Sequence, residues 1–404
     1  MFSPVLFNCL LALVASAANV PRASHVTLSL SRQVNFTGVH NLLQQDQARA
    51  RFLTDRASGH EQSAAIINEP VTNRIVTYLA SVGVGSPPTY YSLIVDTGSS
   101  NTWVGAGKKY AKTKSSKQTQ DSVHVKYGSG SFSGTEYVDT VTLGPSFVVT
   151  QQSIGVASTS NGFTGYDGIL GIGPVGLTKG TLSPHSSATI STVTDNAYSQ
   201  RKISSNFIGI SFRPTTSSSV QNGVLTWGGV DRSRYSGSIN YAPVTSTYPS
   251  SAYWGINESI TYGSRTILSS TAGIVDTGTT LILIATDAFN RYKAATGGVA
   301  DASTGLLRIT SSQYSTLKTL NFNINGRTYG LTPNAQIWPR SLNTAIGGKA
   351  NSIYLVVANI GANSGSGLDF INGYTFLERF YSVYDTTNNR VGFATTPYTS
   401  VTSN

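Results

Sequence analysis

The chain has 404 residues, more than one ordinary hydrophobic core accommodates and enough for two lobes. Its 28 Lys and Arg against 18 Asp and Glu give a formal charge of +10, yet only 11% of its residues are charged, where about 25% is typical. The single cysteine, Cys9, lies in the N-terminal apolar run, so we exclude disulfides, thiol catalysis and cysteine-held zinc from the mature chain.

The low charged fraction indicates a protein suited to acid. Acid unfolds proteins mainly by protonating carboxylates whose pKa is depressed in the folded state. The stability that such groups contribute is present above their unfolded pKa and is lost as pH falls through the folded one. A fold with few ion pairs therefore loses little stability in acid.

The basic balance could also indicate binding to nucleic acid or to an anionic membrane. The densest basic run, Lys108–Lys117, is a polar stretch with one aromatic residue, and no long basic helix occurs elsewhere. We therefore interpret the positive charge as a solvated surface and expect neither partner.

Residues 1–17 have the pattern of a signal peptide. Val5–Val14 is almost wholly apolar, and Ala15-Ser16-Ala17 is a small-x-small cleavage pattern, although Lys and Arg are missing before the run. The run is shorter than the roughly 20 residues of a membrane span, and no other run is long enough. We expect a secreted, extracellular protein that is not held in a membrane.

Residues 18–64 differ in composition from the rest and are interpreted as a propeptide. His25–Leu30 alternates like a strand, and Gly38–Leu53 is helix-like. The stretch carries five arginines, Arg22, Arg32, Arg49, Arg51 and Arg56. We predict an inhibitory basic strap over an acidic cleft, with the mature chain beginning between Gly59 and Ile66; the alternative is an N-terminal extension without a role.

From residue 65 onward, short segments rich in Val, Ile, Thr and Tyr alternate with Gly, Ser and Asn turns. Strands greatly outnumber helices and do not alternate with them, so the sequence predicts a mainly β protein. Helices are expected at Ser191–Ser199, Thr286–Ala295, Ser311–Thr319 and Tyr374–Tyr381.

An internal repeat predicts two related lobes. Ser92–Ser100 (SLIVDTGSS) has a counterpart in Ala272–Thr280 (AGIVDTGTT), and each is followed by a shorter echo, Asp167–Gly171 and Asp369–Gly373. A duplicated unit of this size is a normal domain. We therefore divide the mature chain into an N-terminal lobe, 65–240, and a C-terminal lobe, 241–404.

The repeat can bring two carboxylates together. A strand such as Leu93–Val95 would place Asp96 at its end, Gly98 would permit a tight turn, and Ser99 would donate a hydroxyl to the carboxylate. Two carboxylates about 3 Å apart cannot both ionise, so the pair keeps one proton over an acidic range. One member can then serve as general base on a water and the other as general acid, without a metal or cofactor.

The residues around both repeats resemble the pepsin-like aspartic protease family over about residues 65–396. Val95–Trp103 and Ile274–Thr280 resemble its two active-site signatures, Val125–Ser131 its flap hairpin, and Tyr384–Phe393 its last strand. The resemblance implies a bilobal β fold with a central cleft. It also implies hydrolysis of internal peptide bonds at acidic pH, synthesis as a precursor, and inhibition by pepstatin.

The same resemblance implies roles for single residues. The catalytic pair would be Asp96 and Asp276. The flap and substrate-binding residues would be Tyr127, Gly128, Ser129, Ile169, Gly278, Thr279 and Thr280. The residues supporting the active site would be Thr97, Gly98, Ser99, Trp103 and Thr277.

Two residues depart from the family pattern. The second supporting segment contains Asn372 where an apolar residue is usual, and a buried Asn needs hydrogen-bond partners. The flap has Ser129 where relatives that accept lysine before the cut bond have Asp. We therefore expect a preference for bulky hydrophobic residues around the cut bond.

Other patterns carry weaker signals. Gly171–Gly176 fits a dinucleotide motif formally, but it contains a proline and no helix follows it. His124 and His185, the histidines outside the predicted propeptide, have no metal-ligand spacing. Asn257 begins a glycan acceptor pattern and is a possible glycosylation site, as is Asn35 in the propeptide.

The expected partners are protein and peptide substrates, bound by a monomer. Two alternatives remain at this point: a catalytically inactive binding or inhibitor protein on the same fold, and a basic module that binds surfaces or nucleic acid. Such inactive relatives usually lack a catalytic aspartate or the flap tyrosine, whereas Asp96, Asp276 and Tyr127 are all present.

Overall fold

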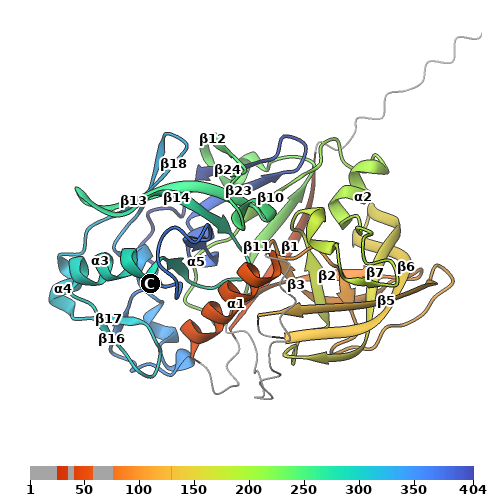
Figure 1. The fold of residues 1–404 in the computed structure, drawn as a ribbon, viewed down its shortest axis with the longest axis horizontal. Coiled ribbons are helices and arrows are strands. Elements are labelled where there is room, and N and C mark those ends of the chain that lie inside the picture. The colour runs from red at the N-terminus through yellow and green to blue at the C-terminus, as the bar shows by residue number, and fades with distance from the viewer. Residues whose placement is uncertain (1–24, 35–40, 58–75, 129) are drawn as a thin grey trace, which may run out of the picture.

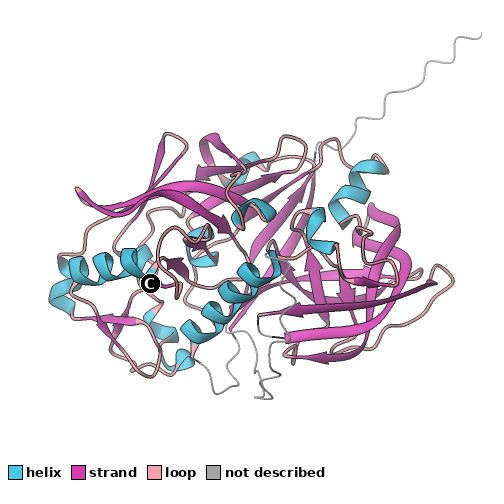
Figure 2. Ribbon diagram, in the orientation of Figure 1, coloured by secondary structure: helices cyan, strands magenta, loops and turns pink. Residues whose placement is uncertain are grey.

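The computed structural model of the chain describes residues 25–34, 41–57, 76–128 and 130–404. The predicted signal peptide, the predicted start of the mature chain, Asn35 and Ser129 lie outside these residues. Within them the chain forms a mainly β molecule of two lobes with a few short helices (Figure 2). The predicted fold class is confirmed.

The largest sheet joins the two lobes. Among the described residues it has 14 strands in the order β12-β24-β23-β10-β11-β1-β2-β3-β8-β4-β7-β6-β5-β9. Its strands are β1 (Val26–Val34), β2 (Val76–Val84), β3 (Thr89–Asp96), β4 (Trp103–Val104), β5 (Lys117–Tyr127), β6 (Gly130–Gly144), β7 (Phe147–Asn161), β8 (Gly168–Gly171), β9 (Leu182–Ser183), β10 (Phe207–Ser211), β11 (Ser219–Trp227), β12 (Ser236–Pro243), β23 (Phe380–Asp385) and β24 (Arg390–Thr395).

Two further sheets belong to the C-terminal half of the chain. One runs β19-β18-β13-β14-β22-β15-β21 and the other β16-β17-β20. Their strands are β13 (Gly255–Tyr262), β14 (Arg265–Val275), β15 (Ile282–Ile284), β16 (Val299–Ala300), β17 (Leu307–Ile309), β18 (Leu320–Ile324), β19 (Arg327–Leu331), β20 (Ile353–Tyr354), β21 (Val357–Asn359) and β22 (Phe370–Asn372).

The sequence repeat is also a repeat of strand pairing. β3 pairs in parallel with β8, so that Val95 lies opposite Leu170, and β14 pairs in parallel with β22, so that Val275 lies opposite Asn372. The apolar runs before both Asp-Thr-Gly motifs are buried on both faces of their strands, which explains why they do not alternate with polar residues. Each motif therefore emerges from the interior of a lobe.

The segment interpreted as a propeptide is built into this fold. β1 pairs antiparallel with β11 on one side and with β2 on the other, so it is an interior strand of the largest sheet. The helix α1 (Leu42–Ala57) follows and crosses the molecule between the two lobes (Figure 1). Asn41 starts the helix, because its side chain accepts from the Gln44 N–H while the Gln44 side chain accepts from the Asn41 N–H.

The other helices are α2 (Val193–Ser199), α3 (Thr286–Thr296), α4 (Ser311–Ser315) and α5 (Tyr374–Leu377). Capping boxes at Thr192 and Thr310 fix the starts of α2 and α4. The predictions for α4 and α5 were too long at their C-terminal ends. Residues Phe380 and Tyr381, predicted as helix, begin β23 instead, because pairing with β24 overrides their helical pattern.

None of the helices in the described ranges is long and apolar enough to cross a membrane. The same ranges contain no group of three or more His, Cys, Asp or Glu side chains arranged to hold a metal ion.

Candidate active site

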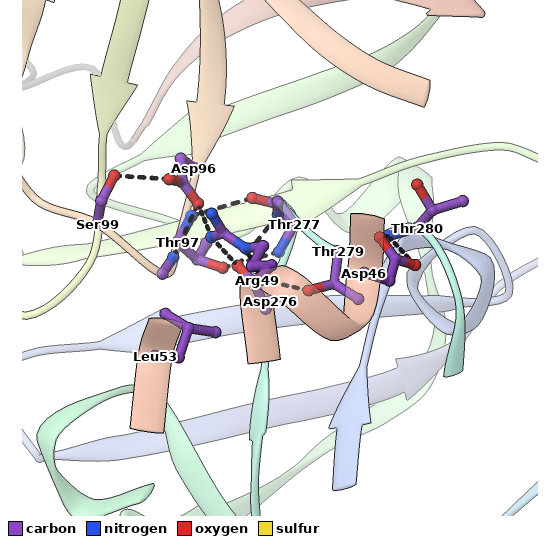
Figure 3. Close-up of polar contacts among 12 residues, drawn as sticks. Asp46, Arg49, Leu53, Asp96, Thr97, Ser99, Asp276, Thr277, Thr279 and Thr280 are labelled. Carbon is purple, nitrogen blue, oxygen red and sulfur yellow. Dashed lines mark hydrogen bonds and ion pairs between the residues drawn. The ribbon is translucent and has the colours of Figure 1, made fainter. Parts of the chain in front are cut away.

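The two Asp-Thr-Gly loops meet where the lobes join (Figure 3). Asp96 ends β3, Asp276 follows β14, and both residues are fully buried. Their neighbours cross between the loops: the Thr97 N–H donates to Thr277 Oγ1 and the Thr277 N–H to Thr97 Oγ1, each at 3.0 Å. The reciprocal bonds lock the loops together about a pseudo-twofold axis.

The two carboxylates have matching hydrogen bonds. Gly98 N–H donates to Asp96 Oδ1 (3.1 Å) and the Ser99 hydroxyl to Oδ2 (2.6 Å). On the other side, Gly278 N–H donates to Asp276 Oδ1 (3.0 Å) and the Thr279 hydroxyl to Oδ2 (2.6 Å). Each carboxylate thus has a fixed orientation, with its Oδ1 atom on the side of the opposite loop.

The motif glycines are required by this close approach. A Cβ atom on Gly98 would lie 2.7 Å from Asp276 Oδ1, and one on Gly278 would lie 2.6 Å from Asp96 Oδ1. Real Cβ atoms do not approach carboxylate oxygens so closely, so a larger residue at either position would push the two aspartates apart.

The supporting segments bind both loops from behind. The Ile172 N–H donates to the Asp96 carbonyl (2.9 Å), while in the other lobe the Asp276 N–H donates to the Asn372 carbonyl (3.1 Å). Ile169, predicted as a substrate-binding residue, lies in β8 and is fully buried. The Asn372 side chain is also buried, and its Nδ2 donates to Glu258 Oε2 at 2.8 Å, so the departure from the family pattern has a partner.

The predicted flap is the hairpin of β5 and β6. Tyr127 lies at its tip end and is buried, and its hydroxyl accepts from Trp103 Nε1 at 2.9 Å. Trp103 in turn stacks on Phe132 (4.2 Å) and meets Phe163 edge to face (4.8 Å). The predicted pair of Trp103 and Tyr127 is therefore in contact, whereas Ser129 lies outside the described residues.

The helix α1 fills the space between the flap and the aspartates. Arg49 Nε lies 2.6 Å from Asp276 Oδ2, and its Nη2 lies 2.5 Å from Asp96 Oδ1 and 2.9 Å from Asp276 Oδ1. Burial lowers the pKa of Arg49, but the charges of Asp276 and Asp96 outweigh it and hold the pKa above its usual range. A Cβ on Gly128 would lie 2.4 Å from the Arg49 Cα, so the flap packs directly on the helix.

A second charged residue of α1 contacts the second loop. The Asp46 carboxylate accepts from the Thr280 N–H at 3.1 Å and from the Leu281 N–H at 2.7 Å. Burial raises the pKa of Asp46 to about 7, against the lowering by these backbone bonds. The backbone N–H of Thr280, a predicted site residue, is therefore hydrogen-bonded to the helix.

Further contacts anchor the segment at both ends. Arg32 of β1 lies 3.4 Å from Glu378 and 5.5 Å above the Tyr374 ring. At the other end, the Tyr253 hydroxyl donates to the Leu53 carbonyl at 2.8 Å, and the Arg56 guanidinium donates to the Leu177 carbonyl.

Sequence reasoning predicted a basic strap but did not single out Arg49 or Asp46. A signal was present, because the buried face of α1 consists of Leu42, Asp46, Arg49, Ala50 and Leu53. Charged residues at i and i+3 among the apolar positions of an amphipathic helix are unusual, and they indicate that the helix packs on charged or polar groups.

The remaining predicted residues lie away from the aspartates. Asn257 is exposed on β13, and its side chain accepts from the Thr245 hydroxyl. His124 bonds to Ser133, and the exposed His185 lies 2.8 Å from Asp121.

Several known proteins resemble the chain over most of its length. It matches the family model described as eukaryotic aspartyl protease over residues 77–396. It is 66% identical over 336 residues to polyporopepsin from Irpex lacteus, covering 83% of this chain and 98% of the relative. It is 30% identical over 354 residues to pepsin A from Sus scrofa, covering 83% and 85%. The crystal structure of an aspartic proteinase from Irpex lacteus superposes with a TM-score of 0.81 at 57% identity, covering 94% of this chain and all of the other.

Proposed function

The chain belongs to the eukaryotic aspartyl protease family and is an aspartic endopeptidase, and from this premise we propose that Asp96 and Asp276 are its catalytic pair. The observation that carries the proposal is the matched geometry of the two loops, each with one backbone and one hydroxyl donor on its carboxylate. The presence of both aspartates and Tyr127, together with 66% identity to polyporopepsin, argues against an inactive binding protein and a basic binding module.

The proposed reaction needs one proton shared by the pair. In acid, one carboxylate is ionised and takes a proton from a water held between the two. The other carboxyl polarises the substrate carbonyl and then protonates the leaving amine. Activity is therefore confined to the acidic range in which the pair holds one proton.

We further propose that residues 18–64 keep the enzyme inactive as a zymogen. The Arg49 guanidinium touches both carboxylates, so it occupies the place that the water and the substrate carbonyl need. Acid that protonates the aspartates removes their charge attraction for Arg49, and the segment then leaves the cleft and is cut. In the zymogen, Asp46 and Arg32 add contacts of the same segment to the C-terminal lobe, with Leu281 and Glu378.

Substrates would bind as extended peptides beneath the flap, partly through backbone hydrogen bonds. The preference for bulky hydrophobic residues is supported by α1 itself, since Phe52 lies against the Tyr127 ring at 6.5 Å and Leu53 is fully buried. Equal cleavage after Lys and after Phe or Leu in a peptide series would contradict this preference.

We also propose that the protein is secreted as a monomer, with residues 1–17 as its signal peptide. Asn257 is exposed and is proposed as a possible glycan site. The lobes would comprise 65–240 and 241–404, and the boundary between them falls inside β12 of the sheet that both share.

The test is the digestion of denatured haemoglobin across pH 2–8 by the activated wild-type enzyme and by Asp276→Asn, with and without pepstatin. We expect activity in acid only, blocked by pepstatin and lost in the variant. Cleavage by Asp276→Asn at the wild-type rate would refute the assignment of the pair.

A further inference from the structure

A buried acid and a buried amide face each other behind the second active-site loop. Glu258 on β13 is 1% exposed, and Asn372 on β22 is 0% exposed. Asn372 Nδ2 donates to Glu258 Oε2 at 2.8 Å. The position corresponding to Asn372 in the first lobe is the apolar Leu170, because both lie opposite the residue that precedes the catalytic aspartate.

The two side chains have one donor too few if Glu258 is ionised. Glu258 Oε1 and Asn372 Oδ1 are both buried, and among the described residues neither has a hydrogen-bond partner. Both are acceptors, and an ionised carboxylate has no proton to offer. An unsatisfied buried acceptor is costly, and a buried unpaired charge more so.

One proton resolves both deficits. A carboxyl group and a carboxamide space their two polar atoms almost equally, so a bond between Nδ2 and Oε2 allows Oε1 and Oδ1 to meet as the second arm of a planar pair. We propose that Glu258 is a neutral carboxylic acid in the folded enzyme, and that its proton closes a two-bond pair with Asn372 that supports the loop carrying Asp276.

No cation is paired with Glu258 in the described residues. The ionisable side chains on or next to the elements packed around β13 and β22 are Tyr241, Tyr253, Tyr262, Arg265, Asp276, Arg291, Lys318, Asp369, Tyr374, Glu378 and Arg379. In the described chain none of them shares a hydrogen bond or ion pair with Glu258, whose side-chain partner is Asn372. Burial raises the pKa of Glu258 to about 8, against a lowering by the Asn372 bond.

The Glu258–Asn372 pair is linked to the active site through the backbone of Asn372. The Asn372 carbonyl accepts the N–H of Asp276 (3.1 Å), while its side chain is held by Glu258. Glu258 is therefore a positioning residue, since it does not touch the reacting atoms. This positioning role rests on the proposed function of Asp276; the neutral acid pair itself does not.

The pair makes stability depend on pH in a defined direction. The pKa of Glu258 is higher in the folded chain (about 8) than its ordinary value of 4.5. Its contribution is therefore complete below about pH 4.5 and is lost as pH rises through about 8. Above that pH the folded protein holds either an unpaired buried charge or an opened pair.

The test is the melting temperature of the full chain between pH 6 and pH 9, outside the acid range of the proposed activity, for wild type and Glu258→Gln. Gln preserves both hydrogen bonds as an amide pair and has no proton to lose. We expect the melting temperature of the variant, relative to wild type, to rise by at least about 2 °C from pH 6 to pH 9. A difference that is constant with pH would overturn the proposal.

Two comparisons keep the result interpretable. Glu136→Gln removes the buried acid of the other lobe, whose pKa burial raises to about 7, so its effect should level off about one pH unit lower and add to that of Glu258→Gln. In the infrared difference spectrum of wild type minus Glu258→Gln, the other buried acids with a raised pKa, such as Asp46 and Glu378, cancel. The carbonyl band of a protonated carboxyl should appear in this difference at neutral pH and be lost near pH 8. Its absence at neutral pH would overturn the proposal.

If Glu258→Gln does not fold, the double variant Glu258→Leu/Asn372→Leu replaces both polar groups by apolar ones, an exchange that is often neutral. It should melt higher than Asn372→Leu alone, which leaves the acid without a partner; equal melting temperatures would refute the pair. In the activated enzyme, Asn372→Leu should lower kcat with little change in KM. An unchanged kcat, beside the expected melting data, would refute only the positioning role.

Discussion

At the scale of single residues, the site is a balance between two buried carboxylates and one guanidinium. Asp96 and Asp276 are fully buried, and two like charges so close are unfavourable without a counter-charge. Arg49 supplies that charge in the precursor, whereas in the active enzyme a proton must do so. The same two carboxylates therefore account both for catalysis and for its inhibition.

Replacing Arg49 tests this balance. We expect Arg49→Gln to lose the prosegment at least about tenfold faster than wild type at pH 5, because breaking a buried ion pair costs several kcal/mol. Mass spectrometry of timed samples measures the conversion. The matched control is Arg51→Gln, two residues away and exposed; equal rates in the two variants would contradict the role of Arg49.

The hydroxyl on each carboxylate is a second residue-scale test. Ser99→Ala removes the donor 2.6 Å from Asp96 Oδ2, and a hydrogen bond to a charged group is worth about 1.5–3 kcal/mol. We expect kcat to fall by about 10- to 100-fold. Ser100→Ala is the control, because the Ser100 hydroxyl donates to the Pro174 carbonyl instead. A kcat loss no larger in Ser99→Ala than in Ser100→Ala would count against the hydroxyl.

At the scale of elements, the strand-loop repeats place the aspartates and a hairpin covers them. The hairpin of β5 and β6 is held at its end by the bond from Trp103 Nε1 to the Tyr127 hydroxyl. The indole thus connects β4, next to the first active-site loop, to the flap above it. Closure of the flap over a substrate should depend on this connection.

Trp103→Phe removes the indole donor and keeps an aromatic ring against Phe132. We expect kcat/KM to fall about fivefold, the worth of roughly 1 kcal/mol, in steady-state assays with a peptide substrate. Trp227→Phe is the comparison, because that indole donates to Thr194 at 3.2 Å, away from the flap. It should lower the melting temperature without lowering kcat/KM. Equal effects of the two changes on kcat/KM would refute a specific role for Trp103.

Some elements could be predicted from sequence and others could not, for physical reasons. The Asp-Thr-Gly loops and the segments behind them were predictable because strand, turn glycine and hydroxyl donor all lie within nine residues. The contact of Arg49 with Asp276 spans 227 residues, and only the helix face of α1 indicated it. The C-terminal end of α5 was missed because strand pairing, a long-range effect, makes Phe380 and Tyr381 part of β23.

At the scale of the whole molecule, the small number of ion pairs and the buried acids Glu136 and Glu258 both favour stability at acidic pH. Among the described residues after β2, the ion pairs are mostly at the surface, such as Asp231 with Arg234 and Asp287 with Arg291. Although burial raises the pKa of these aspartates, hydrogen bonds and the arginines outweigh it and lower the pKa overall. Glu136 and Glu258 instead have a raised pKa because they are buried.

The directions of these pKa shifts predict that the folded protein is more stable in acid than at neutral pH. The surface aspartates contribute stability that is lost only as pH falls below about 3.8, their ordinary pKa, whereas the contribution of the buried acids is lost as pH rises through about 7 and 8. We expect the melting temperature of the activated enzyme to rise as pH is lowered from about 8 to about 4.5, because over this range the buried acids are protonated in the folded chain and ionised in the unfolded one. A steep drop between neutral pH and pH 4, measured by calorimetry, would contradict this profile.

In the proposed mechanism, Asp96 and Asp276 both catalyse peptide-bond cleavage and are blocked in the precursor by α1 of the same chain. The most direct measurement is the mass of full-length Asp96→Asn after purification and incubation alone at pH 3, beside wild type and Asp121→Asn, whose aspartate faces His185. We predict that wild type and Asp121→Asn lose the prosegment while Asp96→Asn keeps its full mass. Loss of the prosegment from Asp96→Asn, incubated without any other protein, would contradict the account.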